Sequence, residues 1–217
     1  MSSTGKLRIL CLHGCRQTGE VFRCRTGAFR KIFKKHVDFL FVTAPLSVKP
    51  LEETSEDVDA GRGWWFSRED NYYKAKDPSN CIKGYKESLE EIENFIQKEG
   101  PIDGILGFSQ GAAMLGLICV LQQRKQLSYN FKFAIIVAGF RSRSEQHQEY
   151  YDDIIDIPTL HVFGHTDQVI EDTMSKELLQ NFKDPVVIEH EGGHFVPASN
   201  LEKDKYLEFI IKMKENN

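Results

Sequence analysis

Residues 102–125 read IDGILGFSQGAAMLGLICVLQQRK, two apolar runs joined by the pentapeptide GFSQG at residues 107–111. The first run predicts a buried strand over Ile102–Phe108, and the second predicts a helix over Gln110–Lys125. The pentapeptide has the form G-x-S-x-G, which places a serine on a sharp turn between a strand and a helix. Such a turn requires small neighbouring residues, and the pentapeptide has a glycine at each end. We therefore predict that Ser109 is a nucleophile exposed at the end of a sheet.

The rest of the chain continues this alternation of strand and helix. Further strands are predicted at Leu7–Leu12, Val37–Ala44, Phe131–Phe140, Pro158–Gly164 and Val186–His190. Further helices are predicted at Glu20–Lys35, Ile82–Lys98, Asp172–Phe182 and Leu201–Lys214. Most of the strands are continuously apolar, which is typical of strands that are covered on both faces. The sequence therefore predicts an α/β fold with a doubly wound, mostly parallel sheet of about six strands and helices on both faces.

The length of the chain favours one domain. It has 217 residues, of which 41% are hydrophobic, enough for one well-buried core. The interval between Phe140 and Pro158 has room for one short helix only, so we predict no large cap domain. We expect residues 1–217 to form a single domain.

One segment, at about residues 45–81, interrupts the alternation of elements. It is polar and acidic at first and then carries Trp64, Trp65 and Phe66. A connection this long without clear periodicity is usually functional or disordered. Two interpretations stay open: the aromatic rings bind substrate at the rim of the cleft, or they anchor an irregular loop to the core.

A nucleophilic serine needs a histidine base and an acid, in the chain order serine, acid, histidine. His194 follows the last predicted strand in a glycine-rich loop, and Asp167 follows the strand before it. Glu171 and Asp172 are alternatives for the acid, but they are better placed to cap the next helix. Less suitable bases are His190, within a strand, His147, in a polar stretch, and His36, at the end of a helix. We predict a catalytic triad of Ser109, Asp167 and His194 in a serine hydrolase of the α/β-hydrolase class.

The oxyanion of the reaction intermediate needs two hydrogen-bond donors. The backbone N–H of Gln110 opens the predicted helix, and the backbone N–H of Cys15 follows the first strand, after a glycine that permits close approach. We predict these two groups as the oxyanion hole, with Cys15 as a weaker alternative nucleophile. No pair of the five cysteines has C-x-x-C spacing, so we expect no metal and no other cofactor.

Composition excludes some partners. The formal net charge is −4 and the lysines and arginines are scattered, so no nucleic-acid partner is expected. The longest apolar runs fall far short of the roughly 20 residues that span a membrane, and no secretory signal is recognisable. We expect a cytoplasmic protein, with a nuclear location also open and the oligomeric state undetermined.

Four motifs together make the sequence similar to the fungal-to-animal serine hydrolase (FSH) family. They are RGWWFS at 62–67, GFSQGAA at 107–113, HVFG at 161–164 followed by Thr166-Asp167, and GGHFVP at 192–197. The resemblance covers almost the whole chain. It implies an α/β hydrolase with the triad Ser109, Asp167 and His194 and a tryptophan segment near the site. Two positions depart from the family pattern: Cys15, where an aromatic residue is usual, and His165, where a carboxylate is common.

The predicted function is that of a serine carboxylesterase. The resemblance implies small-molecule acyl esters, including fatty-acyl esters, as substrates, hydrolysed through an acyl-enzyme intermediate. An acyl-thioesterase is the first alternative, because the same oxyanion geometry serves both leaving groups. A non-catalytic binding module is the second, because a hydrolase scaffold does not guarantee activity.

Overall fold

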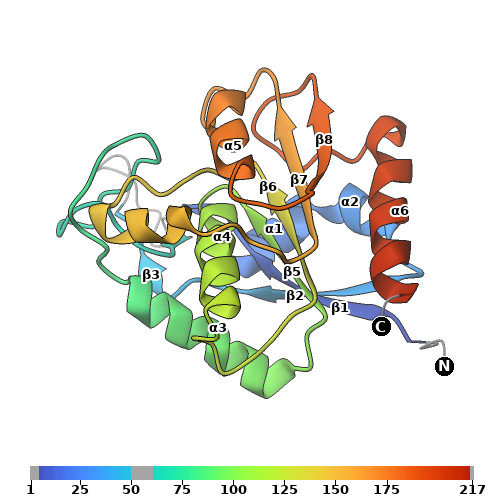
Figure 1. Ribbon diagram of the computed structural model, residues 1–217, viewed down its shortest axis with the longest axis horizontal. Helices are drawn as coiled ribbons and strands as arrows, with labels where there is room; N and C mark the ends of the chain where they lie inside the picture. Colours follow the sequence, from blue (N-terminus) through green and yellow to red (C-terminus); the bar gives the residue numbers. More distant parts are fainter. Residues whose placement is uncertain (1–4, 50–60, 216–217) are drawn as a thin grey trace.

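A computed structural model describes residues 5–49 and 61–215. Its centre is a six-stranded sheet in the order β2-β1-β5-β6-β7-β8 (Figure 1). The strands are β1 (Leu7–Leu12), β2 (Val37–Val42), β5 (Gly104–Phe108), β6 (Phe133–Val137), β7 (Thr159–Gly164) and β8 (Val186–His190). Every pair of neighbouring strands is parallel. The predicted α/β fold is therefore confirmed.

Helices cover both faces of the sheet (Figure 1). They are α1 (Gly19–Arg25), α2 (Gly27–Ile32), α3 (Tyr85–Glu99), α4 (Gln110–Gln123), α5 (Asp172–Leu179) and α6 (Asn200–Glu215). Helices α3, α4 and α5 share one face, whereas α6 lies with α2 on the other, where Tyr206 packs edge-on against Phe29 and Phe33. This arrangement follows from right-handed crossovers that leave the central strands in both directions. Strands β5, β6 and β7 are buried along their whole length, as their continuous apolar sequences predicted.

The predicted helix over Glu20–Lys35 is in fact two helices, α1 and α2, that meet at Thr26. The hydroxyl of Thr26 donates to the carbonyl of Phe22 at 2.7 Å, beside the backbone N–H of Thr26, which donates to the same carbonyl at 3.0 Å. A threonine that bonds back to the preceding turn in this way tends to bend a helix. The other predicted elements are present with ends that differ by a few residues. None of the helices in the described ranges is long and apolar enough to cross a membrane.

No cap domain separates β6 from β7. The interval holds η1 (Glu145–Asp152), a 3₁₀ helix, as the short spacing predicted. His147, expected in a solvated stretch, is instead buried within η1. In the segment at 45–81, residues 50–60 lie outside the described residues, and the described remainder contains the short antiparallel pair β3 (Leu46–Ser47) and β4 (Arg62–Gly63).

Among the described residues, His13, His147 and His161 are each at most 2% exposed, and burial favours the neutral form of their rings. Burial lowers the pKa of His13 from 6.5 to about 4, that of His147 to about 4 and that of His161 to about 3. Below pH 6.5 these histidines are protonated in the unfolded chain. In the folded chain they stay neutral until the pH reaches their lowered pKa values. The contribution of each neutral histidine to stability is therefore complete above about pH 6.5 and decreases as the pH falls below it.

We predict that His161→Gln will reduce the pH dependence of stability. Between pH 7.5 and pH 5, the free energy of unfolding of the wild type should fall by about 2 kcal/mol more than that of the variant. Urea unfolding of both proteins at the two pH values measures this difference, and the packing cost of the substitution cancels within each protein. An identical pH difference in the two proteins would contradict a neutral buried His161.

Candidate active site

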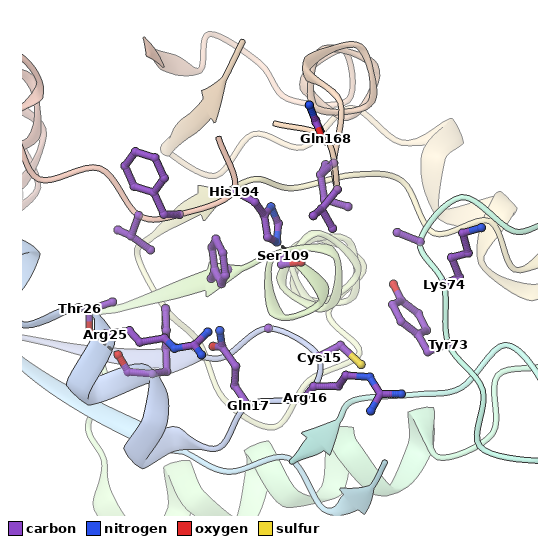
Figure 2. Close-up of a pocket in the computed structure, with 18 of the residues that line it drawn as sticks. Cys15, Arg16, Gln17, Arg25, Thr26, Tyr73, Lys74, Ser109, Gln168 and His194 are labelled. Atoms are coloured by element: carbon purple, nitrogen blue, oxygen red, sulfur yellow. Dashed lines mark hydrogen bonds between the residues drawn. The ribbon is translucent and has the colours of Figure 1, made fainter. Parts of the chain in front are cut away.

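Ser109, His194 and Asp167 meet at the carboxyl edge of the parallel sheet. They follow β5, β8 and β7, respectively, and parallel strands end at a common edge. The Oγ of Ser109 lies 3.0 Å from Nε2 of His194 (Figure 2), and Nδ1 of His194 lies 2.7 Å from Oδ2 of Asp167. The structure thus brings together the three residues that the sequence predicted as a triad.

The turn at Ser109 is strained and tightly packed. Ser109 has a φ of 54°, which is rare for a residue with a side chain, and its N–H donates to the carbonyl of Val137 at 3.0 Å. A Cβ added at Gly107 would lie 2.4 Å from the carbonyl oxygen of Gly111. A Cβ at Gly111 would lie 2.3 Å from the carbonyl oxygen of Leu12. Both glycines of the G-x-S-x-G motif are therefore required by backbone contacts.

Asp167 remains a carboxylate in spite of its burial. Its side chain is only 2% exposed, and burial by itself raises the pKa. The hydrogen bond to His194 and the N–H groups of Val169 and Ile170, each 2.9 Å from Oδ1, outweigh this effect, so the pKa is lowered overall. An ionised Asp167 accepts the Nδ1–H of His194, which leaves Nε2 free to accept a proton from Ser109.

The two predicted oxyanion donors belong to the residue after Ser109 and to the loop that packs against it. Gln110 is the first residue of α4, so its N–H has no acceptor within the helix. The loop that carries Cys15 packs on the nucleophile, because a Cβ at Gly14 would lie 3.3 Å from the Cβ of Ser109. Within residues 5–49 and 61–215, neither N–H has a protein acceptor. Burial raises the pKa of the Cys15 thiol to about 11, so this thiol is a poor nucleophile at neutral pH.

The predicted substrate-binding residues Trp64, Trp65 and Phe66 do not border the cavity. Their side chains are at most 1% exposed, and they belong to the interior. The prediction of direct substrate contact is therefore corrected, and the alternative interpretation as anchors in the core describes these rings. The aromatic motif itself was compatible with both positions, since large rings occur at cleft walls and in cores alike.

The tryptophans instead support the site through the side chain of Gln110. The Oε1 of Gln110 accepts the N–H of Trp64 at 3.0 Å, and its Nε2 donates to the carbonyl of Trp65 at 2.8 Å. The indole N–H of Trp64 donates to the carbonyl of His13 at 2.8 Å. We call Gln110, Trp64 and His13 the buried clamp, because together they join the start of α4 to the loop that carries Cys15.

His13 completes this clamp as a neutral ring. Its Nε2 accepts the N–H of Ala44 at 2.9 Å, so the proton resides on Nδ1, which donates to the carbonyl of Gly14 at 2.8 Å. The side chains of His13 and Gln110 are both fully buried. Sequence reasoning identified the backbone N–H groups of Gln110 and Cys15 as donors, but it missed the roles of the side chains of His13 and Gln110.

A cavity of about 850 Å³ opens beside Ser109 (Figure 2). One part of its wall is apolar and consists of Phe22, Phe108, Val169, Ile170, Phe195 and Val196. Residues Tyr73 to Lys76 form another part of the wall. The segment at 45–81 therefore does border the site, through residues that follow the tryptophans. In the part of the chain that the structure describes, no three His, Cys, Asp or Glu side chains gather as metal ligands.

The sheet, the strained serine turn and the hydrogen-bonded serine, histidine and aspartate define an α/β hydrolase. The model of the family described as serine hydrolase (FSH1) matches residues 1–206, and the chain belongs to this family. Esterase OVCA2 of Danio rerio is 44% identical over 222 residues, which cover 96% of this chain and 98% of that protein. Esterase CG5412 of Drosophila melanogaster is 43% identical over 95% of this chain and 74% of that protein. The chain is thus a serine hydrolase of an esterase family.

Solved structures agree on the fold. Acyl-protein thioesterase 2 of Zea mays superposes with a TM-score of 0.67 at 19% identity, with 98% of this chain and 95% of that chain covered. A monoacylglycerol lipase of Paleococcus ferrophilus superposes with a TM-score of 0.63 at 10% identity, with 98% and 97% covered. These similarities support the α/β-hydrolase fold.

We predict that Gln110→Ala will lower kcat for a nitrophenyl ester roughly 10- to 100-fold, with a smaller effect on KM. Loss of the buried clamp releases the backbone that presents the oxyanion donors, and a displacement of about 1 Å can cost that much in rate. Steady-state kinetics together with thermal unfolding measure the two effects separately.

Gln122→Ala is the matched control. Gln122 lies on the same helix and makes the same kind of clamp, because its amide donates to and accepts from the backbone of Phe131, both at 2.8 Å. This variant should lose stability without the loss in kcat. Equal kcat values for the two variants would show that the Gln110 side chain has only a structural role.

Proposed function

We propose that the protein is a serine carboxylesterase that hydrolyses acyl esters, including fatty-acyl esters, through a covalent acyl-enzyme. The observation that carries this proposal is the continuous hydrogen-bonded chain from Ser109 through His194 to the buried Asp167. This chain opens onto a cavity with an apolar wall. The proposal thus rests on the geometry of the site together with membership of an esterase family.

In the first half of the reaction, the Oγ of Ser109 attacks the acyl carbon while Nε2 of His194 takes its proton. Asp167 stabilises the imidazolium that forms. The carbonyl oxygen becomes an oxyanion, which the N–H groups of Gln110 and Cys15 are placed to bind, with the amino end of α4 favouring negative charge. His194 then returns the proton to the alcohol oxygen as that bond breaks, and the acyl group remains on Ser109.

In the second half, water takes the place of the alcohol. His194 removes a proton from the water, the resulting hydroxide attacks the acyl carbon, and the same two N–H groups stabilise the second oxyanion. Collapse of this intermediate breaks the bond to Ser109, whose oxygen regains the proton from His194. The products are a carboxylic acid and the free enzyme.

The apolar wall indicates where the acyl chain lies. Phe22 and Phe108 stack with ring centres 5.8 Å apart, and Phe108 also contacts the ring of His194 at 4.8 Å between centres. Val169 and Phe195, which are 54% and 50% exposed, extend the apolar surface toward the rim. Contact with a hydrocarbon chain would remove this surface from water, a gain of roughly 25 cal/mol per Å².

We predict that Ser109→Ala will abolish turnover of p-nitrophenyl esters and that Asp167→Asn will lower kcat by about 10⁴-fold. The alanine removes the nucleophile, whereas the asparagine favours the wrong tautomer of His194. Initial rates on an ester series with acyl chains of two to sixteen carbons measure both effects. The chain-length optimum of the wild type would also size the acyl pocket.

A fluorophosphonate probe serves as the control for nucleophile identity, since it should label the wild type and not Ser109→Ala. Thioesters of matched acyl length, run beside the esters, distinguish an esterase from an acyl-thioesterase. Full ester turnover by Ser109→Ala would refute the assignment of the nucleophile. No turnover and no labelling of the wild type would favour a binding module on a hydrolase scaffold.

A further inference from the structure

The wall of the cavity beside Ser109 carries charge of one sign only. Arg16, Arg25, Lys74 and Lys76 line it, and no Asp or Glu of the described residues does. This distribution runs against the chain as a whole, which has 32 acidic and 28 basic residues. The excess of positive charge is therefore a property of the site and not of the surface in general.

The two lysines are partly compensated by neighbouring acids. The Nζ of Lys76 lies 2.6 Å from Oε1 of Glu171, and the Nζ of Lys74 lies 3.9 Å from Oδ1 of Asp77. These carboxylates stand outside the cavity wall. The lysines alone would thus leave only a weak preference for an anion.

Across the described ranges, no carboxylate pairs with either arginine. Arg16 donates from Nη1 to the carbonyl of Lys49 at 2.8 Å, which is a neutral acceptor. Arg25 has no ion pair or side-chain hydrogen bond within residues 5–49 and 61–215. Figure 2 shows its side chain extending from α1 into the cavity beside the amide of Gln17. Two arginines of the cavity wall therefore have guanidinium groups without an anionic partner among the described residues.

The backbone of Arg16 is fixed in an unusual conformation. Its φ is 63°, and its N–H donates to the carbonyl of Arg62 at 2.9 Å. Segment 61–62 approaches so closely that a Cβ at Gly61 would lie 2.4 Å from the carbonyl carbon of Arg16. Left-handed backbone at a non-glycine residue persists only where the surroundings impose it. The backbone of Arg16 is thus fixed directly after Cys15, at the end of the loop that carries the predicted oxyanion donor.

We propose that Arg16 and Arg25, which extend to different sides of the cavity in Figure 2, each give its wall an anion-binding group, and that the preferred substrate is an acyl ester or thioester bearing a carboxylate or phosphate remote from the reacting carbonyl. The proposal rests on the hydrolase activity proposed above. A guanidinium offers paired N–H donors that match carboxylate and phosphate oxygens. The apolar wall holds the hydrocarbon part of such a substrate, while one arginine binds its charged group and the other adds to the positive charge of the wall.

The test uses pairs of substrates that differ only in charge. The first pair is the p-nitrophenyl ester of adipic acid with a free distal carboxylate and the same ester with that carboxylate methylated. The second pair is an acyl-coenzyme A and the same acyl group on neutral N-acetylcysteamine. The first pair places the anion on the acyl part and the second places it on the leaving group, so the arm that responds identifies the source of the charge.

Arg25→Gln and Arg16→Gln should each lower the ratio of kcat/KM for the anionic over the neutral member of the responding pair by roughly tenfold, mainly through KM. Added salt should lower the same ratio in the wild type. Arg23→Gln is the matched control, because Arg23 lies on α1, pairs with Glu20 at 2.8 Å and does not line the cavity. For Arg23→Gln, the ratio of kcat/KM for the anionic over the neutral substrate should equal that of the wild type.

An unchanged ratio in both pairs for Arg16→Gln and Arg25→Gln would overturn the proposal. If Arg25 served only to stabilise the carboxyl end of α1, Arg25→Gln would change thermal stability and leave the ratio of kcat/KM unaltered. That result would also overturn the proposal. Calorimetric binding of the adipate esters to Ser109→Ala separates this question from catalysis. Tighter binding of the anionic ester, lost in Ser109→Ala/Arg25→Gln, supports the subsite even if the wild type hydrolyses neither ester. Equal binding of both adipate esters, together with equal binding of the two members of the coenzyme A pair, refutes it.

Discussion

The close contact between the first turn of α4 and the end of β1 is the constraint on which the site depends. The α-carbon of Gly111 lies so near the carbonyl of Leu12 that a methyl group has no room. This contact brings the loop from His13 to Cys15 against Ser109, and it brings together the two residues, distant in sequence, whose N–H groups we predict as the oxyanion hole. The strain at Ser109 is tolerated because β5 and α4, both buried, fix the two sides of the turn.

Buried polar groups then hold this arrangement in a single state. The neutral ring of His13, the amide of Gln110 and the indole N–H of Trp64 each satisfy backbone groups that would otherwise be buried without partners. A charged group in the place of His13 would carry a large desolvation penalty, and burial keeps this ring neutral. Two kinds of histidine therefore stand near the catalytic edge: His194, which is partly exposed and bonded to a carboxylate, and His13, which is enclosed and structural.

Much of the fold and the relative placement of the triad followed from sequence, because both depend on local patterns. Continuous apolar runs become covered strands, and residues just after parallel strands must share one edge of the sheet. The position of the rings of Trp64 and Trp65 could not be predicted in this way, since it depends on partners that are distant in the sequence: the carbonyl of His13 for the indole of Trp64, and the ring of His147 for Trp65. The division of the first predicted helix at Thr26 is accompanied by a side-chain hydrogen bond to the preceding turn, which periodicity does not reveal.

The positive charge of the cavity lining is another feature that could not be predicted from the sequence. Arg16, Arg25 and the lysines at 74 and 76 come from three separate stretches, so the sequence reads as scattered basic residues without a basic patch. Folding brings them to the lining of one cavity, to which no acidic residue of the described ranges contributes. A protein of net charge −4 weakly repels anions at a distance, but at the cavity the nearby guanidinium groups dominate, because salt screens charges over about 10 Å. Local placement, and not overall composition, therefore determines which substrates the electrostatics of this site favour.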